Sequence, residues 1–328
     1  MRRISLSLVL ALSVLGCSDN GTTPDGSVKV DKGPSPDQTV IPPMTCASPN
    51  ECKDFVLNKL IVPMNNTDAQ KYAFNFNGKT YNALGTVLAL IAQQVPTLEL
   101  QASIEGAINA GKTLVLVRLQ AKSWTDDPAT TGKTWIGAST TCCATPDDKP
   151  ACATEAATTC FNGAKEFSPA AGSTGAPMAG KITASALSLT ATTLVLQLPI
   201  TSAGTLDLAL DSVQVKGTMA AGSPDKITNG VLAGAMSVDQ VNNKLIPTIA
   251  DMMTTVLQDP TTKQSTIDQI QTLFDTNKDK KVTKEELQAN GVIATILAGD
   301  VDLDGDKKAD HLSLGIGFEA IKAVIKDK

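Results

Sequence analysis

The 328-residue chain has little of what many catalytic sites require: it contains one histidine, two tryptophans and two tyrosines. The single histidine, His311, lies in an acidic stretch and not beside a nucleophile, which disfavours a hydrolytic triad. The sequence has no P-loop, no His-Glu-x-x-His motif and no complete dinucleotide fingerprint. The segment Ala171–Gly175 departs from a nucleophile elbow because Ala171 stands where glycine is required. These absences argue against the enzyme classes that carry such motifs.

Positive charge and long apolar runs are also scarce. The formal net charge is −5, and no basic patch with interleaved aromatic residues is present, so nucleic-acid binding is disfavoured. After residue 17, no segment reaches the ~18 uninterrupted apolar residues that are typical of a membrane-spanning helix.

The N-terminus has the pattern of an export signal. Two arginines precede an apolar run over residues 4–15, which is too short for a stable span, and Gly16-Cys17 ends it. A small residue directly before Cys17 resembles the lipobox of bacterial lipoproteins. The resemblance implies that residues 1–17 are a lipoprotein signal peptide and that Cys17 carries the lipid. Ser18 after it implies export to the outer membrane, on its periplasmic or cell-surface face, with the lipid as the membrane contact.

Residues 18–45 are rich in Asp, Gly, Pro, Ser and Thr, and no aromatic residue precedes Phe55. Such a composition buries too little apolar surface to offset the entropy of ordering the chain. We therefore expect a disordered tether that lets the folded part stand away from the membrane.

Cysteine usage indicates an oxidising compartment. Six cysteines remain after Cys17, and an even number in an exported chain favours disulfides. Cys46 and Cys52 are spaced for a local bridge. The other four are Cys142, Cys143, Cys152 and Cys160, for which we predict two bridges of undetermined connectivity. Zinc binding is disfavoured because the sequence has no Cys-x-x-Cys pair.

Residues 46–236 are predicted to form a disulfide-stapled β-rich domain. Alternating apolar residues cover 182–189, 193–200 and 205–219, and Asn77-Gly78 is typical of a hairpin turn. Helical spacing over residues 84–91 and 103–109 predicts helices packed beside the strands. The expected fold class is α+β, with an antiparallel β-sandwich or open barrel and packed helices.

The stretch from residue 275 to residue 286 carries the strongest functional signal. Oxygen-bearing side chains stand at loop positions 1, 3, 5, 9 and 12, position 7 offers a backbone carbonyl, and an apolar Val282 stands at position 8. These ligands are Asp275, Asn277, Asp279, Lys281 through its carbonyl, Thr283 and Glu286. Helical spacing flanks the stretch on both sides, and the segment resembles an EF-hand, which implies Ca²⁺ as the bound ion. Lys280 departs from that pattern, because position 6 is normally a glycine with positive φ.

A second acidic cluster follows at residues 300–310. A loop that starts at Asp302 has the ligands Asp302, Asp304, Asp306 and Asp310, with Ser313 in the closing position. A start at Asp300 would place His311 in the closing position, where a hard cation is poorly served. We favour the Asp302 start, which resembles the Asp-x-Asp-x-Asp calcium loops of extracellular proteins.

These loops lead us to predict a small C-terminal α-helical module over residues 237–328, EF-hand-like and calcium-binding. Apolar residues recur at helical spacing over 238–256 and again at 321–325, whereas residues 312–318 alternate as a strand does. The loop starts are 27 residues apart, nearer to dockerin-type duplications than to ordinary paired EF-hands.

The arrangement resembles the uncharacterised surface lipoproteins of Gram-negative bacteria and implies a structural or binding role, more in keeping with a non-enzyme. One alternative is a carboxylate hydrolase acting on glycan, with Asp126 and Asp127 near Trp124 and Trp135. Another is a docking protein of the cohesin/dockerin kind. Partial burial of the two tryptophans at a sheet edge is the plainer interpretation of that region.

Overall fold

The computed structural model describes residues 44–46, 51–94, 99–201, 204–219, 224–296 and 298–326. Residues 1–40 and 41–328 are separate units, and every element described below belongs to the second. The predicted signal peptide, Cys17 and all but the end of the predicted tether lie outside the described residues.

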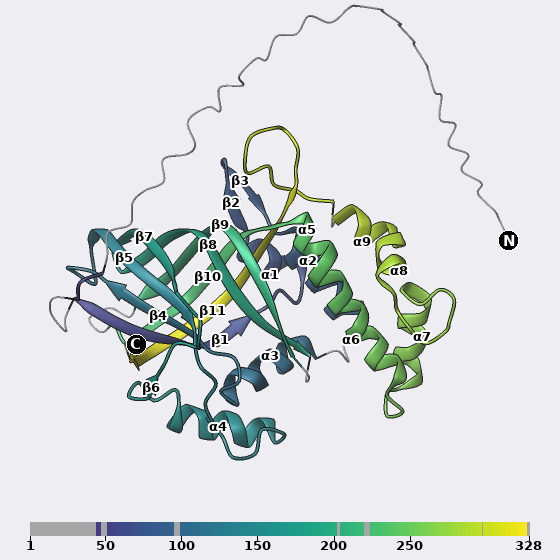
Figure 1. Cartoon of the computed structure of the whole chain (residues 1–328), viewed down its shortest axis with the longest axis horizontal. Helices are drawn as coiled ribbons and strands as arrows, with labels where there is room; N and C mark the ends of the chain where they lie inside the picture. The colour runs from purple at the N-terminus through teal and green to yellow at the C-terminus, as the bar shows by residue number, and fades with distance from the viewer. Residues whose placement is uncertain are drawn as a thin grey trace, which may run out of the picture. The chain divides into compact units, whose positions relative to one another are not determined.

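Eight antiparallel strands form a sheet that closes on itself (Figure 1). Around the ring they are β1 (Cys52–Ile61), β4 (Val115–Gln120), β5 (Asp127–Ile136), β7 (Ala176–Thr183), β8 (Ala186–Thr201), β9 (Gly204–Met219), β10 (Lys226–Ser237) and β11 (His311–Ile325). The ring closes because β11 pairs with β10 on one edge and with β1 on the other. The short β6 (Glu166–Phe167) adds to β11 in parallel and is the ninth strand of the sheet.

The interior of the ring is filled by apolar side chains. Leu119, Met178, Leu187 and Leu189 line this interior and are all 0–2% exposed, as expected where alternate residues of each strand point inward. The interior cavity, lined by residues such as Val117, has a volume of only about 30 Å³. The closed sheet is therefore a packed core.

Helices lie at the ends and on the outer faces of the sheet (Figure 1). Between β1 and β4 the chain forms α1 (Asn66–Lys71), the hairpin β2 (Phe74–Phe76) and β3 (Lys79–Tyr81), α2 (Ala83–Gln94) and α3 (Leu100–Asn109). The predicted turn at Asn77-Gly78 is confirmed, and both residues have positive φ, as a two-residue hairpin turn requires. Between β10 and β11 lie α5 (Val238–Gln240), the π-helical η2 (Val241–Leu245), α6 (Ile246–Gln258), α7 (Gln264–Leu273), α8 (Lys284–Ala289) and α9 (Gly291–Ile296). Every helix among the described residues is too short or too polar to cross a lipid bilayer.

The predicted fold class is wrong in two respects. The strands form one large sheet closed by β1 and β11, and not a sandwich or an open barrel. The chain also does not end in an EF-hand-like helical module, because its last element is the 15-residue strand β11. The helices after β10 are an insertion between two neighbouring strands of the sheet. The apolar spacing at 321–325 belongs to the end of this strand, where Val324 is 40% exposed and Ile325 is buried.

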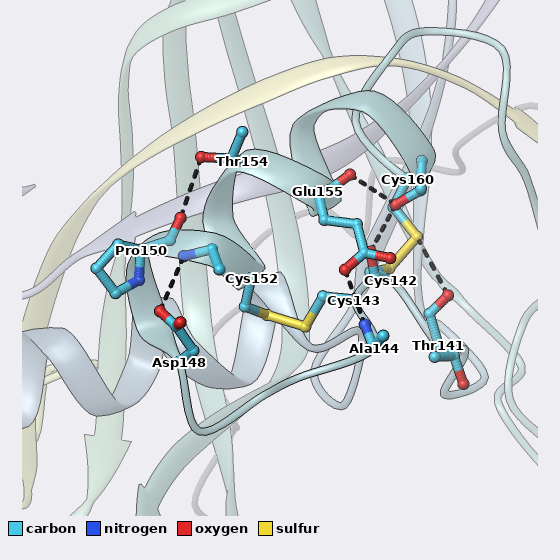
Figure 2. The surroundings of a disulfide bond; sticks show 12 residues. Thr141, Cys142, Cys143, Ala144, Asp148, Pro150, Cys152, Thr154, Glu155 and Cys160 are labelled. Atoms are coloured by element: carbon cyan, nitrogen blue, oxygen red, sulfur yellow. Dashed lines mark hydrogen bonds between the residues drawn. A yellow bond between two sulfur atoms is a disulfide. The ribbon is translucent and has the colours of Figure 1, made fainter.

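Six cysteines pair in three disulfides, which confirms the predicted bridges and adds the connectivity. Cys46 pairs with Cys52, as its spacing indicated. Cys142 pairs with Cys160, and Cys143 with Cys152. Figure 2 shows how the last two bridges join the segment before α4 (Lys149–Thr159) to the start and the end of that helix. A segment with little apolar content is thereby held against α3.

Candidate metal centre

The first acidic loop lies between α7 and α8 and begins with a buried carboxylate. Asp275 is 0% exposed, and its two oxygens accept hydrogen bonds from the backbone N–H groups of Asp279 (3.1 Å) and Lys280 (3.0 Å). A buried carboxylate requires such donors because a buried polar group without hydrogen bonds is costly. Two further side chains, one carboxyamide and one carboxylate, accept hydrogen bonds from N–H groups of the loop backbone. Asn277 accepts from the N–H of Asp279 at 2.9 Å, and Asp279 accepts from that of Lys281 at 2.8 Å.

The second acidic loop, between α9 and β11, repeats three of these four contacts. Asp302 accepts from the N–H groups of Gly305 (2.7 Å) and Lys307 (2.8 Å). Asp304 accepts from the N–H of Asp306 at 3.2 Å, and Asp306 accepts from the N–H of Lys308 at 2.7 Å.

The two loops therefore share one conformation when they are aligned from Asp275 and Asp302. In both loops, the backbone N–H of position 6 donates to the side chain of position 1. The N–H of position 5 donates to the side chain of position 3, and the N–H of position 7 donates to the side chain of position 5. Positive φ falls at positions 4 and 6 of each loop, at Lys278 and Lys280 in the first and at Gly305 and Lys307 in the second. The start at Asp302 is thus the register in which the second loop matches the first. At position 6 both loops hold a lysine in a backbone conformation that favours glycine.

In the second loop the carboxylates gather. One oxygen from each of Asp302, Asp304 and Asp306 lies within 4.8 Å of the other two, and among the described residues this is the trio of acidic groups that could hold a metal ion. Desolvation raises the pKa of Asp302, but hydrogen bonds with Gly305, Lys307, Asp304 and Asp306 together outweigh it, so the pKa is lowered from its ordinary value. The residue is accordingly ionised over the whole physiological pH range.

The closing positions of the two loops differ. Glu286 accepts from the N–H of Thr283 (2.9 Å) through Oε2, whereas its Oε1 is buried and has no hydrogen-bond partner among the described residues. Ser313, the predicted closing residue of the second loop, is 0% exposed in β11 and donates its hydroxyl to Asp300 at 2.6 Å. The fourth predicted ligand, Asp310, contacts Nδ1 of His311 at 2.6 Å and does not join the trio.

The structure therefore brings together some predicted ligands and separates others. The trio of the second loop is assembled, while Ser313 and Asp310 are committed to other partners. In the first loop Asp275, Asn277 and Asp279 surround their own backbone donors, but the carboxylates of Asp275, Asp279 and Glu286 do not gather within 4.8 Å of one another. The side chain of Thr283 caps α8 and also donates to Glu286, at 2.9 Å.

Two contacts beside the loops were not predicted from the sequence. Asp300 binds both the N–H and the hydroxyl of Ser313 and so anchors the second loop to β11. Thr254 of α6 hydrogen-bonds both backbone groups of Val282 in the first loop. No sequence signal identifies Thr254, because it lies on α6, 28 residues before Val282 in the chain.

The region of the alternative glycan site is structural in character. Asp127 is 3% exposed and accepts from the N–H groups of Lys122 and Ala129, and Asp126 accepts from the N–H of Ala184 at 2.8 Å. Both carboxylates thus hold turns of the sheet. Lys133 lies over the ring of Trp135, with its Nζ 5.3 Å from the centroid.

The chain matches no protein-family model, no curated protein and no solved structure.

Proposed function

We propose that the chain is a calcium-binding, lipid-anchored exported protein in which the ion has a structural role. The observation that carries the proposal is the conformation that the two acidic loops share. Two segments of different sequence fold their backbones around carboxylate and carboxyamide oxygens at positions 1, 3 and 5. Oxygen-rich loops of this length and spacing are those in which proteins bind Ca²⁺.

The donors fit a hard cation. Carboxylate, carboxyamide and carbonyl oxygens suit Ca²⁺, and neither loop presents a thiol or an imidazole at its first, third or fifth position. The first loop also contains an unsatisfied acceptor. A buried carboxylate oxygen without a donor is costly, and Oε1 of Glu286 is such an atom at the position that closes the loop.

We expect the two loops to bind Ca²⁺ weakly. Both loops place lysine at position 6, and the second loop has no carboxylate at its closing position. Both features lower the affinity toward the ~0.1–1 mM range that is typical of extracellular calcium modules. Such sites stay occupied outside the cytoplasm and report no signal. The ion therefore acts as a fixed part of the fold.

The proposed cellular location rests on the N-terminal sequence and on the cysteines. The lipobox-like Gly16-Cys17 supports a lipid anchor. Three disulfides support an oxidising compartment such as the periplasm or the cell surface.

Calorimetric titration of Ca²⁺ into the full-length chain in detergent tests the function. We expect saturable binding with a Kd of ~0.1–1 mM. A variant that combines Glu286→Gln with Asp302→Asn should lose it, because each substitution removes a carboxylate from one loop. Asp251→Asn, an exposed charge on α6 outside both loops, is the matched control and should bind as the wild type does. If the combined variant binds calcium as the wild type does, the two loops are not the binding site.

A further inference from the structure

One hydroxyl group on α6 holds the middle of the first acidic loop. Oγ1 of Thr254 accepts a hydrogen bond from the N–H of Val282 at 2.9 Å and donates one to the carbonyl of the same residue at 3.2 Å. Val282 is 2% exposed. The neighbouring α6 residues Met253 and Leu257 are 0–2% exposed, so the hydroxyl projects from a helix that is packed into the core.

These two bonds fix the two peptide units on either side of Val282. A trans peptide unit is planar, and its C=O and N–H groups point in opposite directions. Since the N–H of Val282 points at Thr254, the carbonyl of Lys281 points away from it. Since the carbonyl of Val282 also points at Thr254, the N–H of Thr283 points away from it.

Both groups that point away belong to the ion site. The carbonyl of Lys281 stands at position 7, where the loop supplies a backbone ligand. The N–H of Thr283 donates to Oε2 of Glu286 at 2.9 Å, which holds that carboxylate in place. The other oxygen, Oε1, is then the buried atom without a partner. The protein thus supplies no donor for this oxygen, and a cation bound in the loop would satisfy it.

We propose that Thr254 is a positioning residue for the ion of the first loop. Its hydroxyl aims the carbonyl of Lys281 and, through the N–H of Thr283, the carboxylate of Glu286. The proposal rests on the calcium-binding function proposed above. It adds that the site is completed from outside the loop, by a helix of the insertion between β10 and β11.

The test is calorimetric calcium titration of full-length Thr254→Val and Thr254→Ser, each combined with Asp302→Asn so that the first loop dominates the signal. Valine has nearly the shape of threonine but no hydroxyl, whereas serine keeps the hydroxyl. Two lost hydrogen bonds should weaken binding by about three- to tenfold in the valine variant. The serine variant should bind as the Asp302→Asn parent does.

The melting temperature in chelator separates positioning from stability. A hydroxyl that only stabilises α6 would lower the melting temperature of the valine variant and leave its Kd unchanged, and that result overturns the proposal. If the Asp302→Asn parent binds calcium and the valine variant binds it equally well, Thr254 has no positioning role while the proposed function stands. If neither the wild type nor the parent binds calcium, the proposed function itself fails.

Discussion

Arg118 and Asp54 together hold the end of the last strand. The guanidinium group donates to both oxygens of Asp54, at 2.6 and 2.9 Å, across the pair of strands β1 and β4. The same two side chains bond both backbone groups of Ile325: its N–H donates to Asp54 at 2.8 Å, and its carbonyl accepts from Arg118 at 2.9 Å. One ion pair therefore joins three neighbouring strands where the ring closes.

Replacing Arg118 by methionine should lower the free energy of unfolding by about 1–3 kcal/mol, because it leaves a largely buried carboxylate without its cation. Urea denaturation followed by circular dichroism measures the loss. Lys59→Met is the control, since Lys59 and Glu319 are 3.9 Å apart and nearly half exposed, and such pairs contribute about 0–1 kcal/mol. An equal loss of unfolding free energy in the two variants would contradict a stabilising role of the Arg118–Asp54 ion pair.

The pH dependence of the second loop follows from Asp302. Its pKa lies below the ordinary value of 3.8, because the desolvation that raises it is outweighed by the combined hydrogen bonds with Gly305, Lys307, Asp304 and Asp306. A carboxyl whose pKa is lower in the folded state stabilises the fold above the unfolded value, and this contribution is lost as the pH falls through the lowered pKa. Carbon-13 NMR titration of the carboxyl should therefore give a pKa below 3.8, and a value at or above 3.8 would refute the loop geometry.

Calcium should raise the melting temperature of the protein, and a chelator should lower it. An ion that binds the native state at about tenfold above its Kd contributes about 1.4 kcal/mol of stability. Glu286→Gln should remove most of this rise in melting temperature, because it takes the charge from the closing residue of the first loop, whereas the closing residue of the second loop, Ser313, carries no carboxylate. Asp304→Asn should remove a smaller part. Differential scanning calorimetry with and without calcium measures both, and an unchanged shift in Glu286→Gln would contradict the role of the first loop.

The disulfides should differ in their contributions to stability. Cys142 and Cys160 are 18 residues apart, whereas Cys46 and Cys52 are six apart. Closing a longer loop removes more entropy from the unfolded chain, so the Cys142→Ala/Cys160→Ala pair should cost about 2–4 kcal/mol. The Cys46→Ala/Cys52→Ala pair should cost less in the same denaturation assay. Free thiols in the exported wild type would contradict the pairing altogether.

The lipid anchor is tested by Cys17→Ala. Without the acylated cysteine, we expect the protein to move from the membrane pellet to the supernatant, or to remain as an uncleaved precursor. Cell fractionation and immunoblotting distinguish these outcomes from the wild type. A Cys17→Ala protein that is processed and still sediments with the outer membrane would rule out the lipoprotein assignment.

Local features of the fold were readable from the sequence. The Asn77-Gly78 hairpin, the strands of the alternating runs and the presence of helices after Ser237 follow from turn chemistry and apolar periodicity, although the sequence did not show that these helices are an insertion between two strands. The shared loop register at Asp302 was also favoured by ligand spacing alone. These signals are short-range, and they depend on residues within one segment.

The closed ring and the nature of β11 were not readable in this way. Tyr72 covers the second face of this strand: a Cβ at Gly315 would meet its carbonyl oxygen at 1.7 Å, and one at Gly317 would meet its ring at 2.6 Å. Because both faces are covered, burial is almost continuous from Leu312 to Phe318. Beyond Phe318, buried residues are interspersed with more exposed ones, and Val324 is 40% exposed whereas Ile325 is buried. The apolar residues at 321–325 therefore imitate helical spacing without sharing a buried face. The pairing of β1 with β11 joins segments at opposite ends of the domain, for which no local pattern exists.

The position of β11 also constrains the time at which the protein folds. Asp54 and Ile325 meet across 271 residues of sequence, so the ring cannot close while β11 is still being synthesised. Contacts of such long range are formed slowly. Until then β1 and β10 each have an open edge, and open edges invite pairing with other chains. The nascent chain must therefore be kept from aggregation until its last strand has arrived.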